Sequence, residues 1–125
     1  MAAQSVSVCS WNADRLALDK VLLMQQCWAA VDFVCIQELG KYRNNFDTHT
    51  LYVAPGRSGY RGCGLGIAVK NDLVPSFDYK GLASLGLQWG VWHSPEGVVV
   101  FINVYLHPSR TAQDSQTYFD ALSEL

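Results

Sequence analysis

Polar side chains follow two apolar stretches near the start of the chain, in the runs Ser10–Asp14 and Gln37–Glu38. Taken separately, Asn12 and Asp14 are typical turn formers or helix caps, and Glu38 is typical of an exposed strand end. If both stretches are parallel neighbouring strands joined by a helix, their carboxyl ends meet at one edge of a sheet, where Asn12, Asp14 and Glu38 converge. Oxygen ligands of this kind suit a hard cation, so the pattern predicts a Mg²⁺ site.

A third group of reactive side chains follows another strongly apolar stretch, in the run Asn103–Arg110. Taken alone, Tyr105 is typical of a core residue at a strand rim, and His107 is typical of an ordinary loop. Read beside the other two strand ends, the run places a phenol, an imidazole and the guanidinium of Arg110 at a third strand end.

The glycine-rich run Gly56–Gly66 is not a phosphate-binding P-loop, because no Gly-Lys-Ser/Thr follows it. It is not a dinucleotide-binding fingerprint either, because the glycine spacing differs and no helix is expected after it. Glycines in a strand more often mark a bulge or a close backbone approach. We therefore expect a loop that leads into a hairpin strand over Leu65–Lys70, with Arg57 and Arg61 as candidates for contact with phosphate or DNA.

The elements that would position these groups begin with a strand, a helix and a second strand. Alternating residues predict a strand over Ser5–Trp11, and apolar residues at three- and four-residue spacing predict a helix over Leu16–Val31, capped by Asp14. A five-residue apolar strand over Phe33–Gln37 follows. This order is typical of the opening of an α/β protein.

The rest of the chain favours short antiparallel strands and a final helix. Residues rich in β-branched and aromatic side chains alternate with Gly, Pro, Asn and Asp, and Pro95–Gly97 is a candidate turn. A final helix after Pro108, from Thr111 to Leu125, has an apolar face and an approximate capping box. The remaining predicted strands cover Thr48–Ala54, Cys63–Lys70, Val74–Tyr79, Leu87–His93 and Val98–Tyr105.

Composition indicates one ordered domain of 125 residues, because half of the residues are hydrophobic and the net charge is only −2. This charge argues against a protein held to nucleic acid by bulk electrostatics. It does not argue against an enzyme that meets phosphodiesters through a metal ion. The longest apolar stretch, about Gly97–Leu106, is too short for a membrane span, so no membrane partner is expected.

The four cysteines lie far apart and lack metal-binding spacing. Together with an N-terminus that resembles no secretory signal, they predict reduced, mostly buried thiols in an intracellular protein. No nucleophilic triad is visible either.

Four of these stretches together resemble the endonuclease/exonuclease/phosphatase superfamily. Its Mg²⁺-dependent fold is shared by apurinic endonucleases, pancreatic-type deoxyribonuclease, inositol-polyphosphate phosphatases and neutral sphingomyelinase. Ser10–Asp14 and Asp32–Glu38 are similar to its opening, in which one strand ends in Trp-Asn and the next in Gln-Glu. Arg61–Val69 resembles the glycine-rich strand of non-LTR retrotransposon endonucleases, and Ile102–Tyr105 resembles the following shared strand.

The resemblance implies a role for each candidate residue. Glu38 would be the metal ligand, and Asp14 matches an acidic residue kept near the metal, which is Mg²⁺ with Mn²⁺ as an alternative. Asn12 would help to hold the phosphate and the attacking water, and Tyr105 would hydrogen-bond the scissile phosphate. His107 could match a strand-end histidine of the deoxyribonuclease branch.

The sequence departs from the family pattern in two places. The family often has Tyr-x-Pro-Asn, whereas this chain has one extra residue and a serine in Tyr105–Ser109. The chain also lacks the Gly-Asp-x-Asn and Ser-Asp-His motifs of the second half of the domain. We therefore expect residues 1–125 to be a partial domain, the N-terminal half of a four-layer α/β/β/α sandwich with mixed, mostly antiparallel strands.

The resemblance thus predicts a DNA-nicking endonuclease of retrotransposon type that is inactive, or nearly so, as this fragment. DNA is the expected substrate, and the missing half of the domain and a reverse transcriptase region of a parent protein are the expected partners. Localisation would be nuclear if the protein derives from a retrotransposon. The alternatives are another phosphatase or phosphodiesterase of the superfamily, or a degenerate, non-catalytic remnant or interaction domain.

Overall fold

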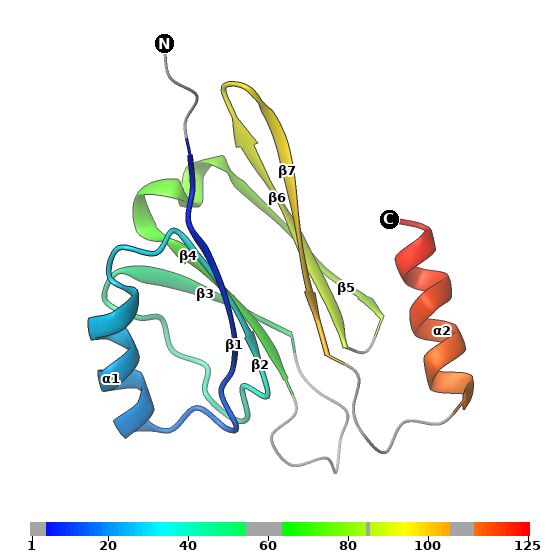
Figure 1. Ribbon diagram of the computed structural model, residues 1–125, viewed down its shortest axis with the longest axis horizontal. Helices are drawn as coiled ribbons and strands as arrows, with labels where there is room; N and C mark the ends of the chain where they lie inside the picture. The colour runs from blue at the N-terminus through cyan, green and yellow to red at the C-terminus, as the bar shows by residue number, and fades with distance from the viewer. Residues whose placement is uncertain (1–4, 55–63, 85, 106–111) are drawn as a thin grey trace.

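The computed structural model describes residues 5–54, 64–84, 86–105 and 112–125, which form a mixed α/β fold as expected from the sequence. Its elements pair into two sheets with one helix beside each (Figure 1). In chain order they are β1 (Val8–Asn12), α1 (Leu18–Trp28), β2 (Phe33–Gln37), β3 (His49–Ala54), β4 (Leu65–Lys70), the 3₁₀ helix η1 (Asn71–Ser76), β5 (Phe77–Ser84), β6 (Leu87–Ser94), β7 (Gly97–Val104) and α2 (Ala112–Ser123).

The first sheet, sheet A, has the strand order β1-β2-β4-β3. Strands β1 and β2 are parallel and are joined through α1, while β4 is antiparallel to both of its neighbours. The predicted strand–helix–strand opening is therefore confirmed, and Asn12 lies opposite Gln37 at the carboxyl ends of the two strands. Strand β2 is buried on both faces, which explains its nearly continuous apolar sequence.

The second sheet, sheet B, is an antiparallel meander in the order β5-β6-β7. The β6–β7 hairpin turns at Pro95 and Glu96, as predicted. Figure 1 shows α1 beside sheet A and α2 on the other side of the molecule, beyond sheet B. Helix α2 packs near β5 and buries Tyr118.

Helix α1 begins later than predicted, and Asp14 is not its cap. The N-cap residue is Ala17, which makes no side-chain capping hydrogen bond. Asp14 and Arg15 adopt a left-handed backbone conformation, with φ of +47° and +64°. A helix cannot begin in that conformation, so the chain first crosses the end of β2 and turns helical only at Leu18.

The strand predicted over Val74–Tyr79 is wrong in its first half. Residues Asn71–Ser76 form η1, and the strand begins only at Phe77 and continues to Ser84. Pro75 lies inside η1. Proline lacks the N–H that a sheet ladder requires, which explains why pairing starts after it. The start of the last predicted helix, at Thr111, lies outside the described residues.

Two apolar clusters hold the layers together. One lies between α1 and sheet A, where Trp28 packs edge-on against Trp11. The other lies between the sheets, where Phe33 of β2 stacks on Phe101 of β7 with ring centroids 4.2 Å apart. Because Phe33 is completely buried, this stack is the centre of the contact between the two sheets.

Strand β7 exposes an apolar stripe on the face turned away from sheet A. Its alternate residues Val98, Val100, Ile102 and Val104 are between 36% and 60% exposed. The strand lies at the edge of sheet B and contains no charged residue. An uncharged edge strand is uncommon, because charged residues or prolines usually keep the edge of a sheet from pairing with another strand.

No helix within the described ranges is both long enough and apolar enough to cross a membrane.

Gly90 provides a test of the packing between β5 and β6. A Cβ atom on Gly90 would lie 2.3 Å from Cζ of Phe77, whose ring is in the core. We expect Gly90→Ala to lower the free energy of unfolding by about 1–3 kcal/mol, because the ring has no free space to enter. Urea denaturation followed by circular dichroism measures this change.

The matched control is the double variant Gly90→Ala, Phe77→Leu, since leucine lacks the ring atoms that clash. The double variant should be no less stable than Phe77→Leu alone. If the double variant instead loses as much stability as the two single variants together, the packing described here is contradicted.

Candidate functional site

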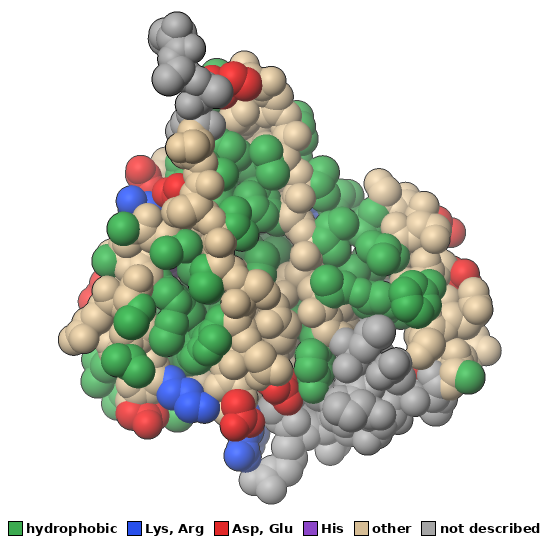
Figure 2. Space-filling view, viewed as in Figure 1, with side chains coloured by type: hydrophobic (Ala, Val, Ile, Leu, Met, Phe, Trp, Pro, Cys, Tyr) green, Lys and Arg blue, Asp and Glu red, His purple; other side chains and the backbone are tan. Residues whose placement is uncertain are grey.

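The site begins where β1 and β2 end side by side. Beyond the paired strands, three further backbone hydrogen bonds join the following segments: Ala13 N–H to the Gln37 carbonyl at 2.9 Å, Arg15 N–H to Glu38 at 2.8 Å and Leu16 N–H to Leu39 at 3.1 Å. The two strand tips are therefore fixed against each other. This confirms that the parallel strands bring the segments of Asn12, Asp14 and Glu38 to one edge. Figure 2 shows charged side chains of both signs gathered along this edge, at the bottom of the view.

Three residues at this edge have a strained backbone. Among the described residues, the only non-glycine positions with positive φ are Asp14, Arg15 and Glu38, the last at +52°. Left-handed conformations of this kind cost energy, and they persist where surrounding contacts hold them. Here the Arg15 N–H bonds directly to the carbonyl of Glu38, so the strained residues support one another. Such strain clusters at functional sites.

Glu38 contacts Tyr105, which directly follows β7 of sheet B. The Tyr105 hydroxyl donates a hydrogen bond to Oε1 of Glu38 over 3.1 Å, and both residues are half-buried. Tyr105 is held at the end of β7 by a 2.9 Å hydrogen bond from its N–H to the carbonyl of Gly86. Two residues separated by 67 positions in the chain therefore share one contact.

Asn12 and Asp14 lie beside this contact and form a turn. Oδ1 of Asn12 accepts a hydrogen bond from the Asp14 N–H at 3.1 Å. This leaves the amide nitrogen of Asn12 as the group that can donate to a ligand oxygen. Both side chains are exposed to solvent. His107, Arg57 and Arg61, which were also predicted to take part in the site, lie outside the described residues.

The donor set fits a cation that needs few protein ligands. Within the described part of the chain, no three His, Cys, Asp or Glu side chains gather closely enough to form a metal cage. One half-buried carboxylate, Glu38, and the exposed Asp14 on the neighbouring tip are the available acids. Mg²⁺ commonly binds through one or two carboxylates and keeps its other ligands as water or phosphate. These residues therefore fit Mg²⁺ better than zinc, which needs three or four tight ligands.

Lys20 supports this site and was not identified from the sequence. Its ammonium group donates to the carbonyls of Ala13 and Asp14, at 2.8 and 2.9 Å. It therefore ties the strained turn to the first helix. Spacing gives no signal for this role, because the carbonyls that Lys20 reaches become available only through the left-handed turn.

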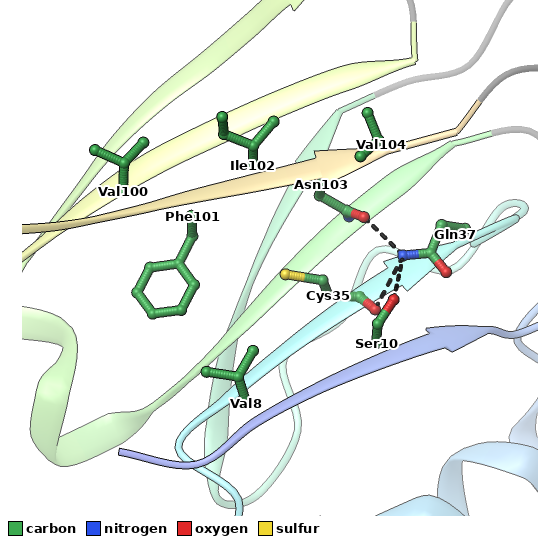
Figure 3. Close-up of a pocket in the computed structure, with 9 residues that line it drawn as sticks. All are labelled: Val8, Ser10, Cys35, Gln37, Val100, Phe101, Ile102, Asn103 and Val104. Atoms are coloured by element: carbon green, nitrogen blue, oxygen red, sulfur yellow. Dashed lines mark hydrogen bonds between the residues drawn. The ribbon is translucent and has the colours of Figure 1, made fainter. Parts of the chain in front are cut away.

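A groove with a volume of about 400 Å³ runs behind the Glu38–Tyr105 contact, between β1 and β7 (Figure 3). Its walls are mainly apolar, including Val8 and Phe101. At one end the amides of Gln37 and Asn103 point toward each other, with Ser10 beside them. Both residues lie in motifs that the sequence singles out, but the contact between their amides was not predicted.

The cysteines differ from the prediction of mostly buried thiols. Cys35 is buried, but Cys9 is half-buried and Cys27, on α1, is exposed. Cys63 lies outside the described residues. Burial, together with the neighbouring Cys9, raises the pKa of the Cys35 thiol from 9.0 to about 11. Cys35 is therefore a thiol rather than a thiolate at neutral pH.

The sequence was compared with protein families and with curated proteins. No protein-family model matches the chain, and a search of curated proteins found no matching sequence.

Gly86 should control the position of Tyr105. Its φ is +83°, and a Cβ atom there would lie 2.1 Å from the Tyr105 carbonyl oxygen. We expect Gly86→Ala to displace Tyr105 and to shift the NMR signals of both Tyr105 and Glu38. Gly81→Ala is the control, because Gly81 has a similar φ of +96° but nothing within 4 Å of the added atom. Equal shifts at the site in both variants would mean that Gly86 does not hold Tyr105.

Cys35 predicts a pH dependence of stability. Because the folded protein holds the thiol proton more tightly than the unfolded chain, this stabilisation is complete below pH 9 and is lost as the pH rises toward 11. The loss attributable to Cys35 is about 2 kcal/mol. Urea denaturation of the wild type and of Cys35→Val between pH 8 and 11 measures it. The variant should lose less stability over this range, and parallel curves would contradict the assignment.

Proposed function

We propose that this chain is the N-terminal half of a Mg²⁺-dependent phosphodiesterase domain that nicks DNA. The observation that carries the proposal is the contact between Glu38 and Tyr105, made across two sheets at an edge where the backbone is strained. A carboxylate for a metal and a phenol for a phosphate oxygen then lie side by side. The motif resemblance to the endonuclease/exonuclease/phosphatase superfamily supports the same assignment.

The arrangement of the layers supports a half-domain. With α1 beside sheet A and α2 beyond sheet B, the chain would supply half of a four-layer α/β/β/α sandwich. Strands β1 and β7 are the edge strands on the same side of the two sheets, on either side of the groove. Strand β7 has no charged residue at its open edge, where further strands could pair, and the exposed stripe on its outer face is apolar surface that a further helix layer could cover.

Each site residue has a defined task in this proposal. A bound Mg²⁺ would neutralise charge that develops on the phosphate during hydrolysis. Glu38 would hold the ion, with Asp14 close to it on the neighbouring strand tip. The amide nitrogen of Asn12 would donate to a phosphate oxygen, and the hydroxyl of Tyr105 would turn from Glu38 to the phosphate when substrate enters.

The chain alone should be a poor catalyst. The described site offers a ligand, an amide and a phenol, but no carboxylate–histidine pair that could activate water. General acid–base catalysis contributes roughly 10²–10⁴-fold to such reactions. In the superfamily the missing groups come from the second half of the domain, so hydrolysis by this chain alone should be near background.

A second candidate function is a non-catalytic interaction domain. The apolar stripe of β7 favours it, because exposed apolar surface of this kind is typical of protein contacts. The retention of Glu38 and Tyr105 in direct contact is what such a domain would not require.

Metal binding tests the site in the chain as it is. We expect Mn²⁺, added as a paramagnetic substitute for Mg²⁺, to broaden the NMR signals of residues around Glu38. Glu38→Gln removes the ligand charge and should raise the Kd by roughly tenfold or more. Glu124→Gln, an exposed acid at the end of the chain, is the control and should leave the Kd unchanged. Equal Mn²⁺ affinity in all three proteins would refute the metal site.

Nicking of plasmid DNA tests the activity. The chain is fused to a second half from an active member of the superfamily and assayed on plasmid DNA, an abasic oligonucleotide and an inositol phosphate. We expect Mg²⁺-dependent nicking that Glu38→Gln abolishes. Undiminished nicking by that variant would reject the role of Glu38, and preference for the inositol phosphate would move the proposal to the phosphatase branch.

A further inference from the structure

Behind the Glu38–Tyr105 contact, a second contact joins the same two strands. Nε2 of Gln37 donates to Oδ1 of Asn103 over 2.8 Å. Gln37 directly precedes Glu38 in the chain, and Asn103 lies in β7 two residues before Tyr105, which directly follows that strand. The amide pair and the carboxylate–phenol pair are therefore adjacent links between sheet A and sheet B.

Asn103 is bound on all sides. It is 1% exposed, and its Nδ2 lies 3.0 Å from the Ile36 carbonyl, 2.9 Å from the Gly66 carbonyl and 3.1 Å from Oε1 of Gln88. Two of these acceptors are backbone groups of sheet A, opposite each other in the β2–β4 ladder. Because hydrogen bonds are directional, this set fixes where β7 sits over sheet A.

Gln37 extends the same network to the first strand. Its Nε2 also lies 3.1 Å from Oγ of Ser10 and 3.3 Å from the Cys35 carbonyl, as Figure 3 shows. One amide therefore ties β1, β2 and β7 together immediately behind the site. An apolar pair would hold the sheets together equally well but would leave them free to slide, since dispersion contacts have little directionality.

We infer that Asn103, acting through Gln37, is a positioning residue that sets the distance between Glu38 and Tyr105. This inference rests on the proposed function, in which that distance decides whether the metal ligand and the phosphate donor reach one phosphodiester. A buried polar network of this kind orients groups more than it stabilises the fold. Loss of the amide pair should separate the carboxylate from the phenol while both sheets stay formed.

A spectroscopic double-mutant cycle tests the inference on the chain itself. Tyrosine is labelled with ¹³C at Cζ, and the Tyr105 signal is assigned through Tyr105→Phe. In the wild type, Glu38→Gln should shift this signal because the hydroxyl loses its charged acceptor. In the Asn103→Leu background the same substitution should shift it by less than about a quarter as much, since the two groups no longer meet.

Two further variants separate positioning from stability. Gln37→Met removes the other half of the amide pair at a half-buried position. It should reduce the coupling, meaning the shift of the Tyr105 signal caused by Glu38→Gln, in the same way. The test therefore holds even if Asn103→Leu does not fold. His49→Leu is the control. His49 is equally buried, at 1% exposed, and lies on β3 at the opposite edge of sheet A, where its ring bonds to the Val31 carbonyl. It should lower stability and leave the coupling intact.

Full coupling in Asn103→Leu or Gln37→Met would overturn the inference, as would its loss in His49→Leu. The outcome is independent of the Mn²⁺ experiment. If Mn²⁺ does not bind but the coupling still depends on Asn103, the proposed function fails and the positioning of Glu38 against Tyr105 stands.

Discussion

The site depends on the fixed distance and register between the two sheets, because its two central groups come from different sheets. At one end the sheets meet through aromatic rings, with Phe33 stacked on Phe101. At the other end they meet through the amides of the half-buried Gln37 and the buried Asn103. Apolar burial supplies most of the attraction between the sheets, whereas the amides define their relative position. The reactive groups lie just beyond the directional contacts, where the register is best defined.

The same edge carries a local cost that the fold must offset. A left-handed non-glycine residue costs about 1–3 kcal/mol, and three of them occur here. The backbone hydrogen bonds between the two strand tips contribute about 1 kcal/mol each, and Lys20 adds bonds to two carbonyls. Gly40 packs against Arg15 where a larger residue would crowd it. The strain is thus retained because neighbouring segments leave the turn no other conformation.

Sequence reasoning reached the adjacency of Asn12 and Glu38, because it follows from the period of the strands and the helical connection between them. It missed the backbone strain at Glu38, since nothing in Gln37-Glu38-Leu39 marks a left-handed residue and the conformation arises from tertiary hydrogen bonds. It treated Asp14 as a helix cap for the same reason. Asn103 was placed in a motif at a strand end, but no partner could be assigned to its amide, because Ile36 and Gln37 lie more than 60 positions away.

Charge explains why the proposed chemistry needs a cation. The chain has a net charge of −2, and the half-buried Glu38 would repel a phosphodiester that approached Tyr105. The ammonium group of Lys20 already donates to two carbonyls of the turn. A divalent ion held by Glu38 would reverse the sign of this interaction, and its effect would be strongest where water is partly excluded. The Tyr105 hydroxyl, which bonds to Glu38 in the structure, would then be available to the phosphate, because the ion would replace it as the partner of the carboxylate.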